Sequence, residues 1–422
     1  MGNQHYDVIV VGAGLAGSSL AGALVTISNK RIAVLERSIP QAITHLNPQS
    51  RPISLSYGSQ QVLATLGWWE NLSAHAIPIN TVNVSQVGRM GVVDFKANDF
   101  HIPALGYVIP YDYLHQQLYE VTAGSNQVDF IQIESIDAIA NQSGSSTLSV
   151  RRDNQVKNLS AQLLLVADGA HSDCRKLLGI DSVAEDEGFV AIAGELHLTT
   201  PHAGKALQRF SDKGVIAILP LSDPHRVQFV LSVTETQKET MKFWGKSRWL
   251  AFWQESLRGY LLVESQKITT EFKLETQMAM EVIRPGVVLL GNAAHTIYPL
   301  AAQGFNLTLR DVAALIELLV SAMNEFPTDW ASPKILRAYA DWREKDARQL
   351  KRFTQLLQSL FHLKIPGLDH LRGLGLMALD GLPGGKKYLG RWLLGLGGKV
   401  PKLARGVLPV QYKIDQEVPH GS

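Results

Sequence analysis

A chain of 422 residues with 45% apolar and 18% charged side chains is long enough for two or three domains, and its composition excludes a disordered chain or a coiled coil. Its net charge of only +2 argues against nucleic acid as a partner, because such binders concentrate positive charge over a whole face. Cys174 is the only cysteine, which excludes an internal disulfide and any multi-cysteine metal site, and favours a reducing, cytoplasmic setting.

The start of the chain predicts a βαβ unit that binds a dinucleotide. Strands are expected at residues 6–11 and 31–36, with a helix between them. Three glycines follow the first strand with the spacing Gly-x-Gly-x-x-Gly, namely Gly12, Gly14 and Gly17. The first permits a tight turn, the second lets a pyrophosphate approach the backbone, and the third allows close helix–strand packing. Glu36 ends the second strand, where a carboxylate can accept hydrogen bonds from a ribose, but this unit does not distinguish NAD from FAD.

The segments after Glu36 indicate that the chain leaves this first domain and returns to it more than once. The expected elements are a helix at 59–66, a hairpin outside the dinucleotide fold at 80–95, a strand at 107–110, a helix at 111–121, and an antiparallel pair at 128–151 around a Gly/Ser turn at 143–146.

A buried strand expected at residues 161–167 ends in Asp168 and Gly169. The glycine allows the backbone to turn sharply after the carboxylate. Taken alone, a strand followed by Asp-Gly is ordinary turn chemistry, and that interpretation is favoured for the pair by itself.

Residues 188–273 predict most of a second domain built on an antiparallel sheet. Strands are expected at 189–198, 215–221 and 227–233, followed by a Trp-rich helical stretch at 241–257. The inner face of this sheet would carry Phe210, Ile218, Pro220 and Phe229. These side chains can form plain core or a substrate wall, and both interpretations stay open.

A third polar signal follows another buried strand, expected at residues 287–290. Gly291 and Asn292 end this strand, and a long apolar helix begins near Leu307. Ligands of open α/β sheets bind at such strand ends, where helix N-termini and free backbone amides converge.

The C-terminal residues 383–413 contain seven Lys or Arg and no acidic residue, interleaved with Trp and Leu. Glycines and prolines make this segment a poor continuous helix. Such a segment suits an anionic membrane surface or a protein partner. A C-terminal cap packed on the body of the protein explains the same pattern equally well.

Together the three motifs resemble those of the class A FAD-dependent aromatic monooxygenases. Within that group the chain is most similar to the ubiquinone-biosynthesis hydroxylases, and best to the branch that hydroxylates 2-polyprenyl-6-methoxyphenol. The resemblance runs from Tyr6 to about Arg352, and the most similar stretches are residues 51–55, 81–85, 209–223 and 291–307.

The resemblance implies an α/β fold. A Rossmann-like FAD-binding domain of the glutathione-reductase type would carry an inserted antiparallel β-sheet substrate domain and a helical C-terminal region. The expected boundaries are 1–75, 107–180 and 281–355 for the FAD-binding domain, 76–106 and 181–280 for the substrate domain, and 356–422 for the C-terminal helical, basic region.

The resemblance also implies the cofactor site. Gly12, Gly14 and Gly17 would hold the FAD pyrophosphate, Glu36 the adenosine ribose, and Asn292 the ribityl chain. The full set of expected cofactor-binding residues is Gly12, Gly14, Gly17, Glu36, Arg37, Arg51, Asp168, Gly169, Gly291, Asn292, Gln303, Gly304, Phe305 and Asn306. Because no second Gly-x-Gly-x-x-Gly follows a strand, NADPH is expected to dock only transiently, near Asp168 and Gly169.

Three residues depart from the family pattern around the expected flavin ring. Asn292 stands where many members have Asp, although an amide oxygen can also accept a ribityl hydroxyl bond. Ala302 replaces a usual glycine, and Tyr298 a common His. No catalytic residue is assigned: His295 and Tyr298 are weak candidates, and a structural role at the helix start is favoured for both. The N-terminus of the helix after Gly304 could stabilise an anionic reduced flavin.

The implied reaction is the NADPH- and O2-dependent hydroxylation of a polyprenylated phenol in ubiquinone biosynthesis, by way of a flavin C4a-hydroperoxide and without a metal. The expected location is cytoplasmic and peripheral at the inner membrane, with residues 383–413 facing the membrane or the proteins of a biosynthetic complex. Two alternatives remain: an FAD-dependent reductase of isoprenoid double bonds, and a non-catalytic, flavin-stabilised subunit of a biosynthetic assembly.

Overall fold

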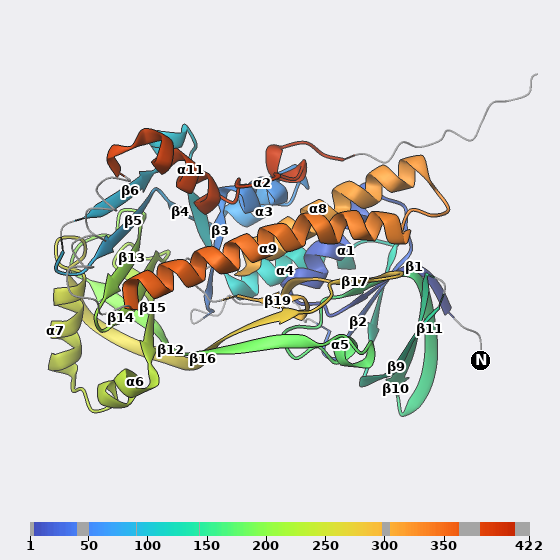
Figure 1. The fold of residues 1–422 in the computed structure, drawn as a ribbon, viewed down its shortest axis with the longest axis horizontal. Coiled ribbons are helices and arrows are strands. Elements are labelled where there is room, and N and C mark those ends of the chain that lie inside the picture. Colours follow the sequence, from blue (N-terminus) through green and yellow to red (C-terminus); the bar gives the residue numbers. More distant parts are fainter. Residues whose placement is uncertain are drawn as a thin grey trace, which may run out of the picture.

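The computed structural model describes residues 4–39, 50–89, 91–142, 144–297, 304–362 and 380–409 of the chain. These residues form two large β-sheets and a small one, with helices packed against them (Figure 1). The predicted α/β fold is confirmed, whereas the exact domain boundaries stay a prediction.

The first sheet lies at the N-terminal end of the molecule and is mostly parallel (Figure 1). Its main strands run in the order β17 (Ile283–Arg284), β18 (Val287–Leu289), β11 (Gln155–Val166), β1 (Gln4–Val11), β2 (Ile32–Glu36) and β8 (Val128–Gln132). Because side chains alternate along a strand, Val8 and Val10 enter one core while Ile9 and Val11 enter another. The first core is covered by helices α1 (Leu15–Ile27), α4 (Tyr111–Ala123) and α8 (Gly304–Glu325), the second by β9 (Ser135–Gln142), β10 (Ser145–Arg152) and α5 (Asp173–Leu177).

The antiparallel pair predicted at residues 128–151 is wrong in its first part. Residues Val128–Gln132 form β8, which pairs in parallel with β2, and only β9 and β10 form an antiparallel hairpin. An apolar strand shows similar periodicity beside a parallel or an antiparallel partner. Local pattern therefore could not identify a partner that lies so far back in the chain.

The second sheet lies at the opposite end and is mostly antiparallel (Figure 1). Its strands run in the order β19 (His295–Thr296), β16 (Val263–Ala279), β12 (Ser182–Leu198), β15 (Arg226–Thr234), β14 (Gly214–Pro220), β13 (Lys205–Ser211), β5 (Thr81–Gln86) and β6 (Val92–Lys96). The long strands β12 and β16 pair from Ser182 and Ala279 to Leu198 and Val263, so they form a ribbon that links the two large sheets. The predicted helical stretch is present as two helices, α6 (Glu235–Met241) and α7 (Lys246–Ser256).

Helices α6 and α7 cover only one face of the second sheet. Ile218 and Phe229 pack beneath them, and the Phe229 ring lies 4.7 Å from that of Trp253 between centroids. Phe210 lies on the opposite face with Val215. The prediction that Phe210 shares a face with Ile218 is therefore wrong. Ile218 pairs with Leu207, and Phe210 lies three positions further along β13, so its side chain points the other way.

The small third sheet connects the two large ones. It contains β3 (Pro52–Ser56), β7 (Gly106–Pro110) and β4 (Ile77–Ile79), flanked by α2 (Tyr57–Thr65), α3 (Trp69–Ser73) and η1 (Ala97–Phe100). Ile79 and Val108 of this sheet pack against Ala206 and Leu219 of the second sheet. The face of the second sheet that α6 and α7 leave open is therefore turned toward the third sheet.

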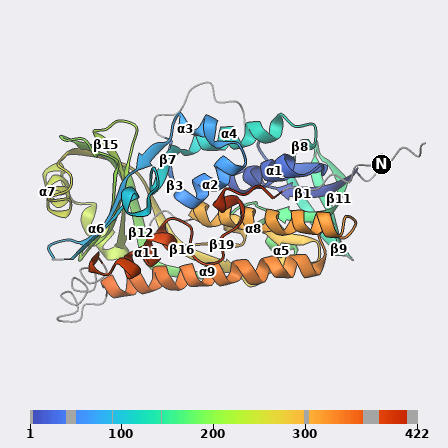
Figure 2. The same ribbon diagram turned by 90° about the horizontal axis from the view of Figure 1, so that it is seen from above.

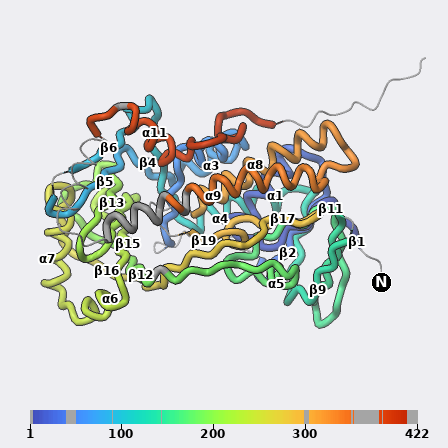
Figure 3. The backbone as a smooth tube through the Cα atoms, viewed as in Figure 1, coloured from blue at the N-terminus to red at the C-terminus, as the bar shows by residue number. Residues whose placement is uncertain are grey.

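Helices α8 and α9 (Pro333–His362) run side by side along the molecule (Figure 2). The C-terminal segment, residues 380–409, consists of α11 (Pro383–Leu393), a connection and η4 (Leu403–Arg405), and it extends from the second sheet to α2 (Figure 3). Leu394 and Leu403 are fully buried, so this segment is packed on the body of the protein, as one of its two predicted interpretations requires. Residues 410–413 of the predicted basic tail lie outside the described part.

Candidate functional site

The glycine turn after β1 contains two glycines that the fold needs and one that it does not. Gly12 has a φ of +99°, and a Cβ there would lie 2.5 Å from the Ala167 carbonyl oxygen. A Cβ on Gly17 would lie 1.8 Å from the Gly12 carbonyl oxygen. A Cβ on Gly14 would meet no atom within 4 Å. Gly12 and Gly17 are thus required by close backbone packing, while Gly14 leaves its side of the turn open to a ligand.

Glu36 lies at the edge of this turn. One carboxylate oxygen accepts a hydrogen bond from the Ala13 amide at 2.6 Å, and the other accepts from the Arg37 amide at 2.7 Å. The Arg37 side chain is exposed and pairs with Asp173 at 2.7 Å. His115 of α4 also reaches the turn, with its Nε2 2.6 Å from the Ala13 carbonyl oxygen. No sequence signal in α4 pointed to His115.

Asp168 follows β11 directly beside the glycine turn, because the preceding Ala167 is the residue that packs against Gly12. Its Oδ2 accepts a hydrogen bond from the Cys174 amide at 3.1 Å. Its Oδ1 is buried and has no partner among the described residues. Gly169 has a φ of +92° and open space around it. Asp168 and Gly169 therefore form the ordinary turn that was favoured for them. The Oδ1 atom of Asp168 is not used by that turn.

Cys174 does not add a reactive group to this corner. Burial, together with the neighbouring Asp168, raises the pKa of its thiol well above the ordinary value. The thiol therefore stays protonated and packs as a small apolar side chain.

The third motif packs against the first. Gly291, with a φ of +56°, opens η2 (Gly291–Ala293), and a Cβ on it would lie 3.1 Å from the Ala16 Cβ of α1 and 3.4 Å from Thr308 of α8. Asn292 is exposed at this point. The contact of Gly12 with Ala167 and the approach of Gly291 to Ala16 bring all three predicted motifs to one corner of the first sheet, at the C-terminal ends of β1, β11 and β18.

The N-terminus of α8 borders the same corner. Gly304 has open space on its Cα side, and Phe305 is half-buried. The Asn306 amide is used by the fold: its oxygen accepts from the Ser56 amide at 2.8 Å and its nitrogen donates to the Ser54 carbonyl at 3.0 Å. Asn306 thus anchors α8 to β3 through both ends of its side-chain amide. The predicted site residue Gln303, and also Tyr298 and Ala302, lie outside the described residues.

Arg51 lies at the opposite side of this corner. Its guanidinium carbon is 4.4 Å from the centre of the Tyr111 ring at the start of α4, and its side chain is exposed. The carbonyl oxygen of Arg51 accepts a hydrogen bond from the Tyr111 amide at 2.9 Å. The guanidinium is therefore placed by stacking on Tyr111, and no described residue accepts a hydrogen bond from it.

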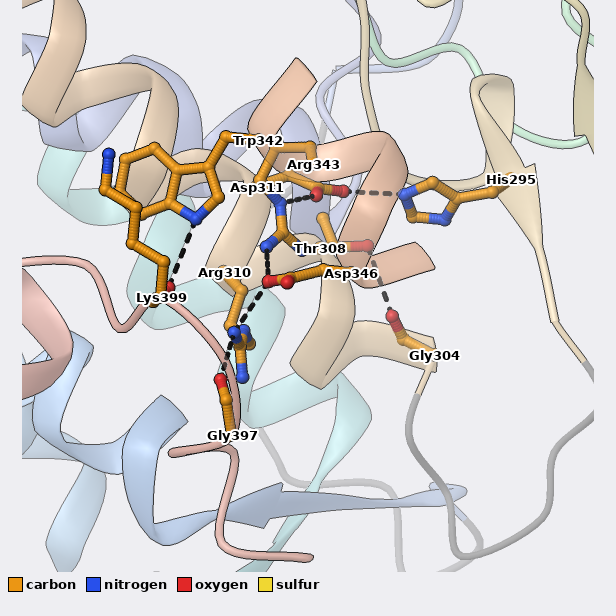
Figure 4. Close-up of polar contacts among 10 residues, drawn as sticks. All are labelled: His295, Gly304, Thr308, Arg310, Asp311, Trp342, Arg343, Asp346, Gly397 and Lys399. Atoms are coloured by element: carbon orange, nitrogen blue, oxygen red, sulfur yellow. Dashed lines mark hydrogen bonds and ion pairs between the residues drawn. The ribbon is translucent and has the colours of Figure 1, made fainter. Parts of the chain in front are cut away.

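His295 is held inside the protein. Its Nε2 lies 2.7 Å from Asp311 Oδ2 of α8, and both side chains are buried (Figure 4). Asp311 also accepts a hydrogen bond from Arg343 Nε at 2.6 Å. These contacts support the structural role favoured for His295. Asp311 and Arg343 were missed by sequence reasoning, because charged residues in a helix are normally assigned to its solvated face.

The open face of the second sheet is turned toward the third sheet, whose strand β3 is anchored to the start of α8. Strand register places several small side chains on this open face, among them Ala193, Ala206 and Ala217. Half-buried side chains flank them, namely Val82, Val84, Leu219, Gln228 and Val230. Gln208 shares this face and is only 8% exposed. Its amide has no hydrogen-bond partner in the described part of the chain. The open face is thus mostly apolar, and its polar groups include the amides of Gln208 and Gln228 and the ion pair of Arg226 with Glu195.

Two further features of the described residues concern metal ligands and helix hydropathy. Among the described residues, no three His, Cys, Asp or Glu side chains are grouped as a metal site would need. The described helices also include none with the length and hydropathy of a membrane span.

Comparison with known proteins gives a consistent result. The profile of the FAD binding domain family matches residues 5–354. The 3-demethoxyubiquinol 3-hydroxylase of Escherichia coli is 28% identical over 410 residues, which cover 94% of this chain and 100% of that protein. The mitochondrial ubiquinone biosynthesis monooxygenase of Xenopus tropicalis is 28% identical over 429 residues, covering 90% of this chain and 91% of that protein.

Solved structures show the same fold. The p-nitrophenol 4-monooxygenase of Pseudomonas putida superimposes with a TM-score of 0.76 at 15% identity, covering 94% of this chain and 100% of that one. The anhydrotetracycline hydroxylase of Streptomyces rimosus gives a TM-score of 0.69 at 22% identity, covering 94% of this chain and 77% of that one.

Proposed function

The chain belongs to the FAD binding domain family, and we propose that this FAD-dependent monooxygenase hydroxylates the ring of a polyprenylated phenol in ubiquinone biosynthesis, with NADPH and O2 as co-substrates. The family match and the curated relatives confirm the predicted resemblance to ubiquinone-biosynthesis hydroxylases. The observation that carries the proposal is the meeting of three cofactor motifs at one corner, together with the mostly apolar open face of the second sheet.

The residues present fit FAD. Gly14 leaves the turn open for a pyrophosphate, and the helix α1 that begins behind it directs its N-terminus toward that anion. The buried, unpartnered Oδ1 of Asp168 and the exposed Asn292 offer acceptors to the cofactor hydroxyls. Glu36 would exchange its contact with the Ala13 amide for a ribose. When bound, FAD supplies the redox and oxygen chemistry that the resemblance implies.

The protein would orient the flavin and the substrate, exclude water from the site and stabilise negative charge on the flavin. The N-terminus of α8 would direct free amides toward the ring of the flavin, where a partly buried helix end stabilises negative charge by about 1 kcal/mol or more. Asn306 holds that end of α8 against β3. The third sheet and the open face of the second sheet keep water from the ring of the substrate.

The open face also suits the proposed substrate. The alanines on it leave space for an aromatic ring, and the flanking Val and Leu side chains suit methyl and prenyl groups. The amides of Gln208 and Gln228 can bind a neutral phenol hydroxyl. Arg226, one of the cations that the strand register places on this face, is paired with Glu195. A face of this kind favours an uncharged phenol over a ring that carries a free carboxylate.

We expect Gln208→Leu to raise the KM for the phenol while FAD affinity stays unchanged. A single hydrogen bond contributes about 0.5–1.5 kcal/mol, so KM should rise about tenfold at most. Steady-state kinetics and flavin titration measure the two quantities. Gln155→Leu, at an exposed strand start far from this face, serves as the matched control. An unchanged KM for Gln208→Leu would remove this residue from the substrate site.

The outer face of the C-terminal segment fits an anionic membrane surface at the inner membrane. Lys387, Arg391 and Lys402 are exposed there, and Tyr388 is 64% exposed. On its inner side the same segment packs against Val82 and Val84, which flank the open face of the second sheet. A prenyl chain that lies in the membrane would therefore be close to the proposed binding site of the phenol ring.

We expect the triple variant Lys387→Gln, Arg391→Gln, Lys402→Gln to bind vesicles of phosphatidylcholine and phosphatidylglycerol about a hundredfold more weakly. Each basic residue near such a surface contributes about 1 kcal/mol. Vesicle sedimentation measures the binding. The exposed residues Arg152 and Lys157 of the β10–β11 hairpin, changed to Gln, give the control. Equal binding by all forms would argue for a protein partner instead.

The reaction itself is tested with purified protein, FAD, NADPH, 18O2 and a prenylated methoxyphenol. One labelled oxygen atom in the ring of the product supports the proposal. Oxygen-independent consumption of an isoprenoid double bond would favour the reductase alternative. FAD that binds but is never reduced by NADPH, even with the phenol present, would favour the non-catalytic subunit.

A further inference from the structure

Five buried ionisable side chains form a continuous chain of contacts through the middle of the protein (Figure 4). They are His295, Asp311, Arg343, Asp346 and Arg310, and none of these side chains is more than 9% exposed. Asp311 links His295 to Arg343 at 2.7 Å and 2.6 Å, and Asp346 links Arg343 to Arg310 at 2.5 Å and 2.7 Å.

One end of this chain lies at the proposed cofactor site. His295 follows η2 after a single residue, Ala294, and starts β19, which pairs with β16. Asp311 and Arg310 belong to α8, whose N-terminus at Gly304 borders the same site. The pair of His295 with Asp311 therefore fixes the distance between Asn292 and the start of α8.

The other end of the chain lies in the C-terminal segment. Arg310 donates to the carbonyl oxygens of Gly395 and Gly397 at 2.9 Å and 2.8 Å. Trp342 of α9 donates from Nε1 to the Lys399 carbonyl oxygen at 3.1 Å, and the Lys399 ammonium lies 3.9 Å from the centre of the Trp342 ring. Among the described contacts, α2 also donates to the segment, from the Gly58 amide to the Leu394 carbonyl oxygen at 2.8 Å and from Thr65 Oγ1 to the Leu403 carbonyl oxygen at 2.9 Å. Of the side chains that hold the segment, Arg310 is the one that belongs to the ionic chain.

Burial makes these contacts interdependent. A buried charge is tolerated only while its partners remain in place. If the C-terminal segment lifts away, Arg310 loses two acceptors, and its Nε already has no partner among the described residues. The guanidinium would then turn toward solvent, and Asp346 would lose one of its two cations. Because Arg343 contacts both Asp346 and Asp311, this loss would also disturb the contact of Asp311 with His295.

We propose that residues 394–398 are a positioning element of the flavin site, which acts through Arg310, Asp346, Arg343 and Asp311 on His295 and the start of α8. The proposal rests on the FAD site described above. Coupling between two binding events is reciprocal. Docking of the segment strengthens FAD binding, and FAD binding in turn holds the segment in place.

The test uses full-length protein and measures hydrogen exchange at residues 394–398 with and without FAD. In the wild-type chain FAD should slow exchange there. In Arg310→Met the FAD-induced protection of 394–398 should disappear while that of α1 remains, and the dissociation constant of FAD should rise about tenfold, within the usual range of coupling between sites. The visible spectrum of bound flavin should shift as well, which a general loss of stability would not cause.

Two further variants keep the result interpretable. Trp342→Phe removes one hydrogen bond to the segment and leaves every ion pair intact, so it should weaken FAD binding to a smaller extent. Arg348→Met, on the exposed side of α9, breaks only its pair with Glu344 and should change nothing. FAD that binds tightly to all four forms, with no effect on exchange at 394–398, would overturn the coupling. Failure of the wild-type chain to bind FAD would instead refute the proposed function.

Discussion

Gly14→Val should leave the protein folded and abolish its binding of FAD. The extended backbone at this position suits any residue, and no protein atom lies within 4 Å of the new Cβ. The cost to the apoprotein is that of a poorer helix N-cap, about 1 kcal/mol. The branched side chain would occupy the space through which a pyrophosphate approaches the turn. Flavin fluorescence titration should show affinity lowered by more than about a hundredfold, or about 3 kcal/mol.

Gly17→Ala gives the opposite pattern at a neighbouring glycine. Its Cβ would lie 1.8 Å from the Gly12 carbonyl oxygen, and neither backbone can move without separating α1 from β1. The apoprotein itself should therefore unfold at a much lower temperature. Circular dichroism of both apoproteins separates the two cases. Normal FAD affinity in Gly14→Val would place the pyrophosphate elsewhere.

The second large effect is expected for Arg343→Met. Removing this buried guanidinium leaves Asp311 paired with His295, and Asp346 with Arg310, as their remaining ionic partners among the described residues. Removing one partner of a buried ion pair costs about 3–5 kcal/mol. Urea unfolding of the FAD-free protein measures the loss. Arg348→Met, about 7.5 Å further along α9 by helix geometry and on its exposed side, should cost less than about 1 kcal/mol because surface pairs contribute little.

Acid should reduce the difference between wild type and Arg343→Met. Burial alone would raise the pKa of Asp311, but the charges of Arg343 and His295 outweigh it and hold this pKa below its ordinary value. A carboxyl with a depressed folded pKa stabilises the protein above its unfolded pKa of about 4, and this stability is lost as the pH falls through the folded pKa. Arg343→Met lacks most of that contribution to the free energy of unfolding. Acidification should therefore destabilise the variant less than the wild type. A difference that stays constant from pH 7 to pH 3 would contradict this account.

The parts of the fold that depend on neighbouring residues could be predicted from the sequence. The glycine turn, Glu36 and the helix between them lie within one short unit, and each residue has a local geometric reason. Strand β8 was assigned to the wrong kind of pair, because its parallel partner β2 is distant in sequence. Phe210 was placed on the wrong face, because the pattern shows alternation but not which face α7 covers.

The ionic chain could not be predicted at all. His295, Asp311, Arg343 and Gly397 are brought together by the packing of α8, α9 and the C-terminal segment, and no spacing in the sequence records that packing. Charged residues in a helix are normally assigned to a solvated face. Here the second helix and the C-terminal segment cover that face, so the same residues become internal.

Arg310 recognises the C-terminal segment through main-chain carbonyl groups of two glycines rather than through side chains. These hydrogen bonds therefore do not depend on the side chains that the segment exposes to solvent. The exposed side chains of the segment can accordingly be substituted without breaking these hydrogen bonds. Lys387, Arg391 or Lys402, proposed above to face a membrane, could therefore be exchanged to attach the protein to a chosen scaffold, while the hydrogen bonds from Arg310 to the segment are kept.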